Sequence, residues 1–217
     1  QAPVNVTVFY ESLCPDSIRF ITQQLYPTWT QLTSEYLAVD FVPYGKAQQT
    51  VSAEGEWNFA CQHGPNECVG NIVQACALRT LREQPEKQME FINCVMGSED
   101  PSTGGEQDRR LVLQDRRLVG QENSTTASYD YSLPPQCGRS LNISYSEIST
   151  CTHSREGPQL LSGLGNRTHD FQPLITFVPT VMFNSVYNAD DQTDSLSNLK
   201  SVVCRHLTGV KPSSCDH

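Results

Sequence analysis

The residues whose types and spacing best suit chemistry are a cysteine and a serine three positions apart, Cys14 and Ser17. Residues 4–10 before them alternate in the pattern of a β-strand, and residues 18–25 after them have apolar side chains at a helical spacing. Cys14 is therefore expected where a strand passes into a helix N-terminus. Unpaired N–H groups and the helix dipole favour an anion there, so the thiol is expected to be nucleophilic.

Ser17 stands where a dithiol redox centre would have its second cysteine. In such a centre the first thiolate attacks a disulfide to form a mixed disulfide, and the second thiol resolves it. A hydroxyl cannot do this, so dithiol reduction is predicted to stop at the mixed disulfide unless an external thiol such as glutathione, or another cysteine, completes it. Ser17 can donate a hydrogen bond to the Cys14 thiolate, whereas Asp16 disfavours that thiolate by like-charge repulsion.

Cysteine usage and glycosylation sequons together indicate an oxidising, secretory compartment. The chain has nine cysteines, and four N-x-Ser/Thr sequons at Asn5, Asn123, Asn142 and Asn166. The odd count leaves one thiol unpaired or joined to a second chain, and Cys14 is the candidate, so a Cys14-linked dimer stays open. The disulfide candidates are Cys61, Cys68, Cys76, Cys94, Cys137, Cys151, Cys204 and Cys215. Only the Cys204–Cys215 bridge is suggested by closeness in sequence.

The composition of the 217 residues suits one large domain or a domain with a large insertion. The net charge of −9 argues against a nucleic-acid partner, and no apolar run is long enough to span a membrane. The chain begins at Gln1 rather than Met, which leads us to expect that a leader has been removed.

Two strands and a helix are expected to position Cys14. The helix of about 15–33 follows the first strand and is interrupted by Pro27, and residues 37–42 form the second strand. Strand, helix and strand in this order form a βαβ unit with parallel strands. Further elements are expected as a strand at 180–183 and helices at about 71–82, 87–95, 157–165 and 192–207. Because Pro179 directly precedes the later strand, that strand must lie at an edge or a bend.

Residues 98–135 are rich in small and polar residues and contain a seven-residue near-repeat at 107–113 and 114–120. They are interpreted as a solvated surface arm with a local duplication. The alternative is an arm that carries two dibasic protease sites or a partner motif.

One cysteine-rich segment, residues 61–76, resembles the signature of the gamma-interferon-inducible lysosomal thiol reductase (GILT) family, C-Q-H-G-x-x-E-C-x-x-N-x-x-x-x-C. The matching residues are Cys61, Gln62, His63, Gly64, Glu67, Cys68, Asn71 and Cys76. Residues 10–14, 26–29, 42–47, Val178-Pro179 and the Cys204…Cys215 pair also look like family positions. The arm does not.

The resemblance implies an α/β fold, a thioredoxin-like core with a disulfide-rich helical insertion. In a single domain of residues 1–217, the core is expected at about 1–55 and 156–217 and the insertion at about 56–155. The resemblance also implies that Val178-Pro179 is the cis-proline loop beside the redox cysteine, so the catalytic candidates are Cys14, Ser17 and Pro179. It implies disulfide-bearing protein substrates in the lysosome or outside the cell, and neither a cofactor nor a metal.

The Cys-x-x-Ser departure leaves three interpretations open. A GILT-like scaffold that has lost dithiol reductase activity and acts mainly by binding a protein is favoured. The alternative is a monothiol exchange enzyme that uses Cys14 with glutathione or another external thiol. In the third, Ser17 replaces a natural cysteine by engineering.

The signature residues have two competing roles as well. Cys61, Cys68 and Cys76 could bind zinc together with His63, since cysteine and histidine clusters bind this metal. Disulfides between the cysteines are favoured instead, because the compartment is oxidising. His63 is either a proton donor near the redox site or the hydrogen-bonding partner of a local turn, and the second is favoured. Glu67 is expected to stabilise a helix N-terminus.

Overall fold

The computed structural model describes residues 2–103 and 136–216. Its strands are β1 (Val4–Tyr10), β2 (Leu37–Pro43), β3 (Gln48–Val51), β4 (Trp57–Ala60) and β5 (Thr180–Phe183). Its α-helices are α1 (Pro15–Phe20), α2 (Tyr26–Tyr36), α3 (Pro65–Thr80), α4 (Pro85–Met96), α6 (Gln136–Ser140), α7 (Tyr145–Thr152), α8 (Glu156–His169) and α9 (Ala189–His206). The described residues also form a π-helical turn, η1 (Ile21–Leu25), and two 3-10 turns, η2 (Pro101–Thr103) and η3 (Ser213–Cys215).

A three-stranded sheet in the order β2-β1-β5 forms the centre of the fold. Strand β2 runs parallel to β1 from the Val4–Leu37 pair to the Tyr10–Pro43 pair, which confirms the predicted βαβ unit. Strand β5 runs antiparallel to β1 at the sheet edge, at the residues predicted for it. The edge position explains how a proline can directly precede this strand.

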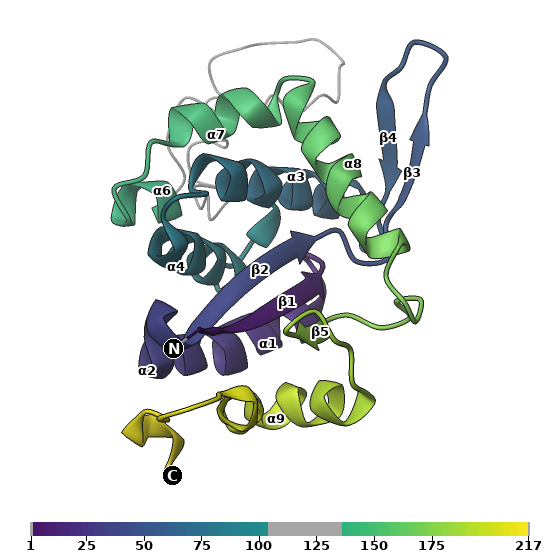
Figure 1. The fold of residues 1–217 in the computed structure, drawn as a ribbon. Helices are drawn as coiled ribbons and strands as arrows, with labels where there is room; N and C mark the ends of the chain where they lie inside the picture. The colour runs from purple at the N-terminus through teal and green to yellow at the C-terminus, as the bar shows by residue number, and fades with distance from the viewer. Residues whose placement is uncertain (1, 104–135, 217) are drawn as a thin grey trace.

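Helices cover both faces of the sheet, so its central strand is buried on both sides. Figure 1 shows α3 and α4 over one face and α1 and α9 beyond the other. Val6 and Val8 of β1 and Phe91 of α4 are fully buried in the main core. The valines at 4, 6 and 8 are buried on one face of β1, and Thr7 and Phe9 are buried on the other.

The expected helix of about 15–33 extends to Tyr36 as α1, η1 and α2. Its interruption takes the form of a π turn just before Pro27, in which the Tyr26 N–H donates to the Ile21 carbonyl. Because proline has no N–H, a regular helix would leave a carbonyl four residues earlier without its donor, and a π turn reorganises those bonds. Thr33 has φ 58° and breaks α2 at the expected end.

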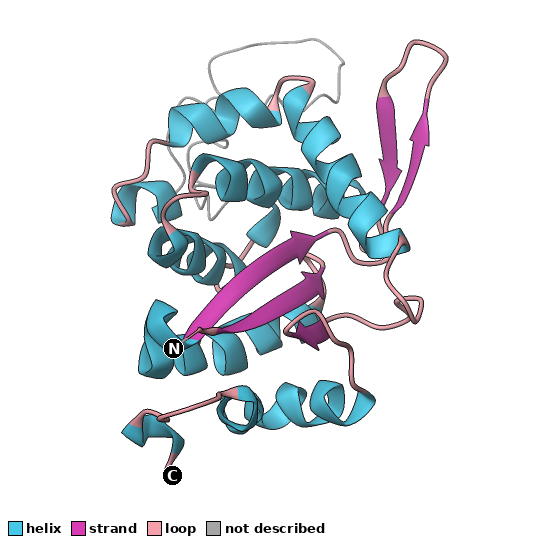
Figure 2. Cartoon of the chain, viewed as in Figure 1, coloured by secondary structure: helices cyan, strands magenta, loops and turns pink. Residues whose placement is uncertain are grey.

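Several elements differ from the expectations. Helix α3 begins at Pro65 and α4 at Pro85, because proline suits the first helical position, where its missing N–H would be unpaired. Helices α6 and α7 and the β3–β4 hairpin, which projects from the body in Figure 2, were not expected. The arm expected from 98 contains Ser102, which is 4% exposed. The near-repeat at 107–120 and Asn123 lie outside the described residues.

Four disulfides join the eight candidate cysteines, and Cys14 is left free. The pairs are Cys61–Cys68, Cys76–Cys151, Cys94–Cys137 and Cys204–Cys215. The second and third link α3 to α7 and α4 to α6, so they fasten the helical layer. Helix α8 contacts α3 and α7 as well as β2, and the division into core and insertion stays a prediction.

Removing the long-range disulfide should cost more stability than removing the short-range one. Cys76 and Cys151 are 75 residues apart, whereas Cys204 and Cys215 are 11 apart. Chain entropy predicts a loss of about 4 kcal/mol in the free energy of unfolding for the first pair and about 3 for the second, on replacing both partners with alanine. Urea unfolding measures both losses, and a larger loss for the Cys204–Cys215 pair would contradict the expectation.

Candidate active site

Cys14 lies at the junction of β1 and α1, as the sequence predicts. It is the N-cap residue of α1, with extended backbone at φ −70° and ψ 121°. Its side chain is 8% exposed, and its Sγ lies 3.8 Å from the carbonyl oxygen of Val178, to which the thiol donates. The residue thus combines a free thiol with a contact to the segment around Pro179.

Ser17 is fully buried one turn into α1. Its Oγ accepts a hydrogen bond of 3.3 Å from the backbone N–H of Glu11, and that bond turns the hydroxyl oxygen toward the end of β1. The predicted hydrogen bond from Ser17 to the Cys14 sulfur is not among the contacts of the described residues. Asp16 forms an exposed ion pair with Arg19, which offsets the repulsion expected between Asp16 and a Cys14 thiolate.

The loop before β5 is held by a residue that sequence reasoning missed, Gln192 of α9. The Val178–Pro179 peptide bond is cis, as the family resemblance implies. Gln192 Nε2 donates to the Pro179 carbonyl at 3.0 Å, and Gln192 Oε1 accepts from the Val181 N–H at 2.7 Å. A lone glutamine on a predicted amphipathic helix gives no sequence signal for this role.

The signature segment docks the residues just before Cys14 onto α3. The Ser12 N–H donates to Asn71 Oδ1 at 3.0 Å, and Ser12 Oγ donates to the Glu67 carbonyl oxygen at 3.1 Å. A Cβ on Gly70 would lie 2.5 Å from Ser12 Oγ, so only glycine allows this approach. Asn71 and Glu67 therefore fix the position of the redox segment, a role that the motif alone did not reveal.

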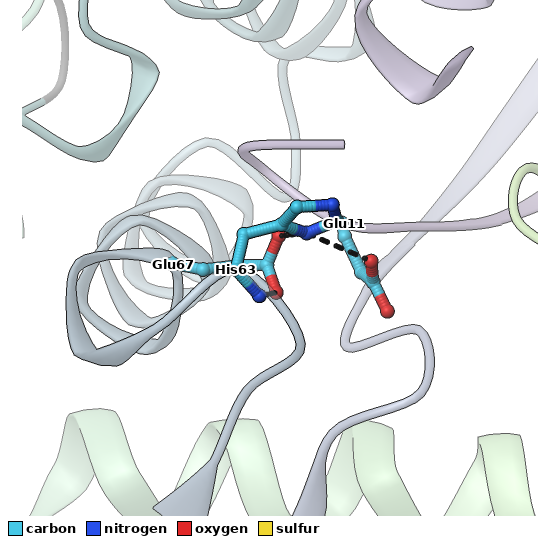
Figure 3. A group of neighbouring side chains, drawn as sticks. All are labelled: Glu11, His63 and Glu67. Atoms are coloured by element: carbon cyan, nitrogen blue, oxygen red, sulfur yellow. Dashed lines mark hydrogen bonds and ion pairs between the residues drawn. The ribbon is translucent and has the colours of Figure 1, made fainter. Parts of the chain in front are cut away.

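His63 lies between two buried carboxyl groups, Glu11 and Glu67 (Figure 3). Its Nδ1 is 2.6 Å from Glu67 Oε2 and 3.4 Å from Glu11 Oε2. Its backbone N–H donates to Glu67 Oε1 at 3.1 Å, so Glu67 acts at the helix N-terminus through this turn. These contacts agree with the favoured interpretation of His63 as the partner of a local turn.

Glu11 is fully buried, and burial is the main reason why its pKa is raised. The nearby Glu67 raises the pKa further, whereas the hydrogen bond from the Lys46 N–H to Glu11 Oε1 at 2.7 Å, and the charges of His63 and Lys46, lower it. Gly45 has φ +59°, and a Cβ there would lie 2.2 Å from Glu11 Cγ. The turn after β2 therefore needs glycine to admit this carboxyl group.

The remaining signature residues have structural positions. Cys61 pairs with Cys68 across the turn before α3, and Cys76 joins α3 to α7, so these cysteines form disulfides rather than zinc ligands. Gly64 has φ +90°, and Gln62 is exposed. Among the described sequon residues, Asn5, Asn142 and Asn166 are all exposed, as glycosylation requires.

A free cysteine at a strand-to-helix junction, beside a cis proline that precedes an edge strand, is the arrangement expected of a protein with a thioredoxin-like core. Residues 5–109 match the family model described as gamma interferon inducible lysosomal thiol reductase (GILT). GILT-like protein 1 of Drosophila melanogaster is 32% identical, over 99% of this chain and 79% of the relative. The gamma-interferon-inducible lysosomal thiol reductase of Mus musculus is 30% identical, over 98% and 72%. The chain belongs to the GILT family.

Among solved structures, the oxidoreductase DsbA from Xylella fastidiosa is similar over 94% of this chain and 87% of its own, with a TM-score of 0.45 and 10% identity. None of the helices in residues 2–103 and 136–216 has the length and apolar character needed to cross a membrane.

Replacing Gln192 with alanine should loosen the cis-proline loop. The Val181 N–H and the Pro179 carbonyl would lose their partner, so we expect the free energy of unfolding to fall by about 1–3 kcal/mol. We also expect faster alkylation of Cys14 by iodoacetamide. The exposed Gln159 provides the matched control as Gln159→Ala. Equal alkylation rates in both variants would show that Gln192 does not position the loop.

Replacing Glu11 with glutamine should change how stability depends on pH. Because the pKa of Glu11 is raised in the folded state, its contribution to stability is fully present below its unfolded pKa and is lost as pH rises through the folded pKa. Relative to the wild type, Glu11→Gln should therefore gain stability as the pH rises above about 4, the ordinary range of a glutamate pKa. Urea unfolding with EDTA present measures this, with the exposed Glu147→Gln as control. A difference that does not vary with pH would contradict the expectation.

Proposed function

We propose that this GILT-family protein carries out monothiol disulfide exchange, with Cys14 as nucleophile and an external thiol such as glutathione as resolving partner. One observation carries the proposal: Cys14 is free beside the Val178 carbonyl, while all eight other cysteines are tied in disulfides. The site keeps its nucleophile and its cis-proline loop, and it has Ser17 where a resolving thiol is needed.

The exchange balances with two molecules of external thiol. The Cys14 thiolate attacks one sulfur of a substrate disulfide, forms a mixed disulfide and releases the other sulfur as a thiolate. The first external thiolate attacks the Cys14 sulfur and releases the substrate as a second thiolate. A second external thiolate then attacks the sulfur of the first external thiol, which is now bonded to Cys14. This step regenerates the Cys14 thiolate and releases the two external thiols as one disulfide.

A disulfide-bearing protein is the proposed substrate. The segment before Pro179 presents two large apolar side chains to solvent, Leu174 at 68% and Phe177 at 42% exposed. Apolar side chains grouped next to a reactive group support contact with a polypeptide. The names of the relatives and the exposed sequons support a secreted or lysosomal location.

A second candidate is a binding protein that keeps the fold without turnover. The small exposure of Cys14 favours it, because only 8% of the residue is open to an incoming disulfide. In that case the apolar side chains around Phe177 would contact a partner directly, and Cys14 would be dispensable.

The two candidates differ in a disulfide-reduction assay between about pH 4.5 and 7, with and without glutathione. For monothiol exchange we expect wild-type turnover only with glutathione, and no turnover in Cys14→Ala. In Ser17→Cys, the new thiol should resolve the mixed disulfide at Cys14 without glutathione. Single-turnover mass spectrometry should detect a Cys14 adduct in the wild type.

Turnover that appears only in Ser17→Cys, with no wild-type adduct, would favour the binding protein. Release of fully reduced substrate by the wild type in a single turnover without any small thiol would overturn both candidates, because it requires a resolving group that the proposal denies.

A further inference from the structure

We propose that Glu11, His63 and Glu67 form a binding site for one divalent transition-metal ion of the zinc type. Within the described residues, their ligand atoms lie within 4.8 Å of one another (Figure 3). The three residues come from the end of β1, the turn before α3 and the first turn of α3. The proposal departs from the expectation that members of the family lack a metal, and it does not rest on the proposed function.

An oxygen of Glu11 supplies the observation that points to a ligand. Glu11 is fully buried, and its Oε2 has no hydrogen-bond partner among residues 2–103 and 136–216. This atom faces the cluster, 3.4 Å from His63 Nδ1. A buried carboxylate oxygen without a donor is costly, and a bound cation is one of the ways in which proteins compensate it.

Both carboxyl groups are already oriented as a metal site requires. In Glu11, Oε1 accepts from the Lys46 N–H, and in Glu67, Oε1 accepts from the His63 N–H. Each group therefore has one oxygen fixed by a backbone donor and the other, Oε2, turned toward His63 Nδ1. Hydrogen bonds of this kind orient the side chains that coordinate a metal ion in proteins.

The spacing and charge suit a small dication. Tetrahedral ligands with bonds of about 2.0–2.2 Å lie about 3.4 Å apart. The distance from His63 Nδ1 to Glu11 Oε2 is already 3.4 Å. The distance from His63 Nδ1 to Glu67 Oε2 is 2.6 Å, and it would lengthen by about 0.8 Å when an ion replaces the proton between these two atoms. Two carboxylates and a neutral imidazole carry a charge of −2.

The donor set favours zinc over calcium or magnesium. An imidazole nitrogen with two carboxylate oxygens suits Zn²⁺ and its neighbours, whereas calcium and magnesium prefer oxygen ligands alone. Three protein ligands leave a fourth position for water, and the His63 side chain, 30% exposed, marks the side from which solvent reaches the site. A filled site would tie Glu11, three residues before Cys14, to α3.

The test is titration of the full-length protein with Zn²⁺, by calorimetry at neutral pH after treatment with EDTA. All variants carry Cys14→Ala, so that the thiol cannot bind the ion. We expect one ion per chain with a Kd of about 1 μM or tighter. Thermal unfolding should show a Tm higher by about 5 °C or more at a hundredfold excess over Kd.

Glu67→Gln and Glu11→Gln should each weaken binding by more than about tenfold and, at the same Zn²⁺ concentration, lower the rise in Tm by about half or more. The exposed Glu147→Gln loses the same charge elsewhere and should bind as the Cys14→Ala parent does. Since Glu11→Gln alters the core, His63→Ala at a partly exposed position provides a third test. Absence of Zn²⁺ binding in the parent, or equal binding by the parent, Glu67→Gln and His63→Ala, would overturn the proposal.

Discussion

The hydrogen bond from the Ser12 N–H to Asn71 is the contact on which the site depends. Residues between a strand and a helix cannot satisfy all their backbone groups within either element. Here α3 supplies the missing acceptor, and the close approach of the two segments needs Gly70. The position of Cys14 is thus set by the helical layer as much as by its own strand and helix.

This docking gives the signature segment a physical meaning. Its cysteines close the turn before α3 and fasten α3 to α7, while its Asn71 and Glu67 hold the chain two residues before Cys14. The motif therefore specifies a platform for the segment around Cys14, and this platform does not require a cysteine at position 17. Ser17 fits the buried position because its oxygen accepts from a backbone N–H.

The sequence predicted the parts of the structure that follow local rules. The strands around Cys14, the later strand at 180–183 and the helices other than α6 and α7 were visible in their periodicity, and the family resemblance implied the cis bond before Pro179. The partners of Gln192 and Glu11, by contrast, come from elements far apart in the chain, and no local pattern encodes such meetings. The projecting β3–β4 hairpin was missed because only Val51 in its first strand is strongly apolar.

Two disulfides have a consequence for proteolysis. Cys76–Cys151 and Cys94–Cys137 both connect chain before residue 97 to chain after residue 135. The dibasic pairs Arg109-Arg110 and Arg116-Arg117 lie between those points in the sequence. A protease that cuts there produces two polypeptides that remain one covalent molecule, so a processed two-chain form would keep its size until reduced. Reducing thiols, the reagents of the proposed exchange reaction, are also those that would separate the two chains.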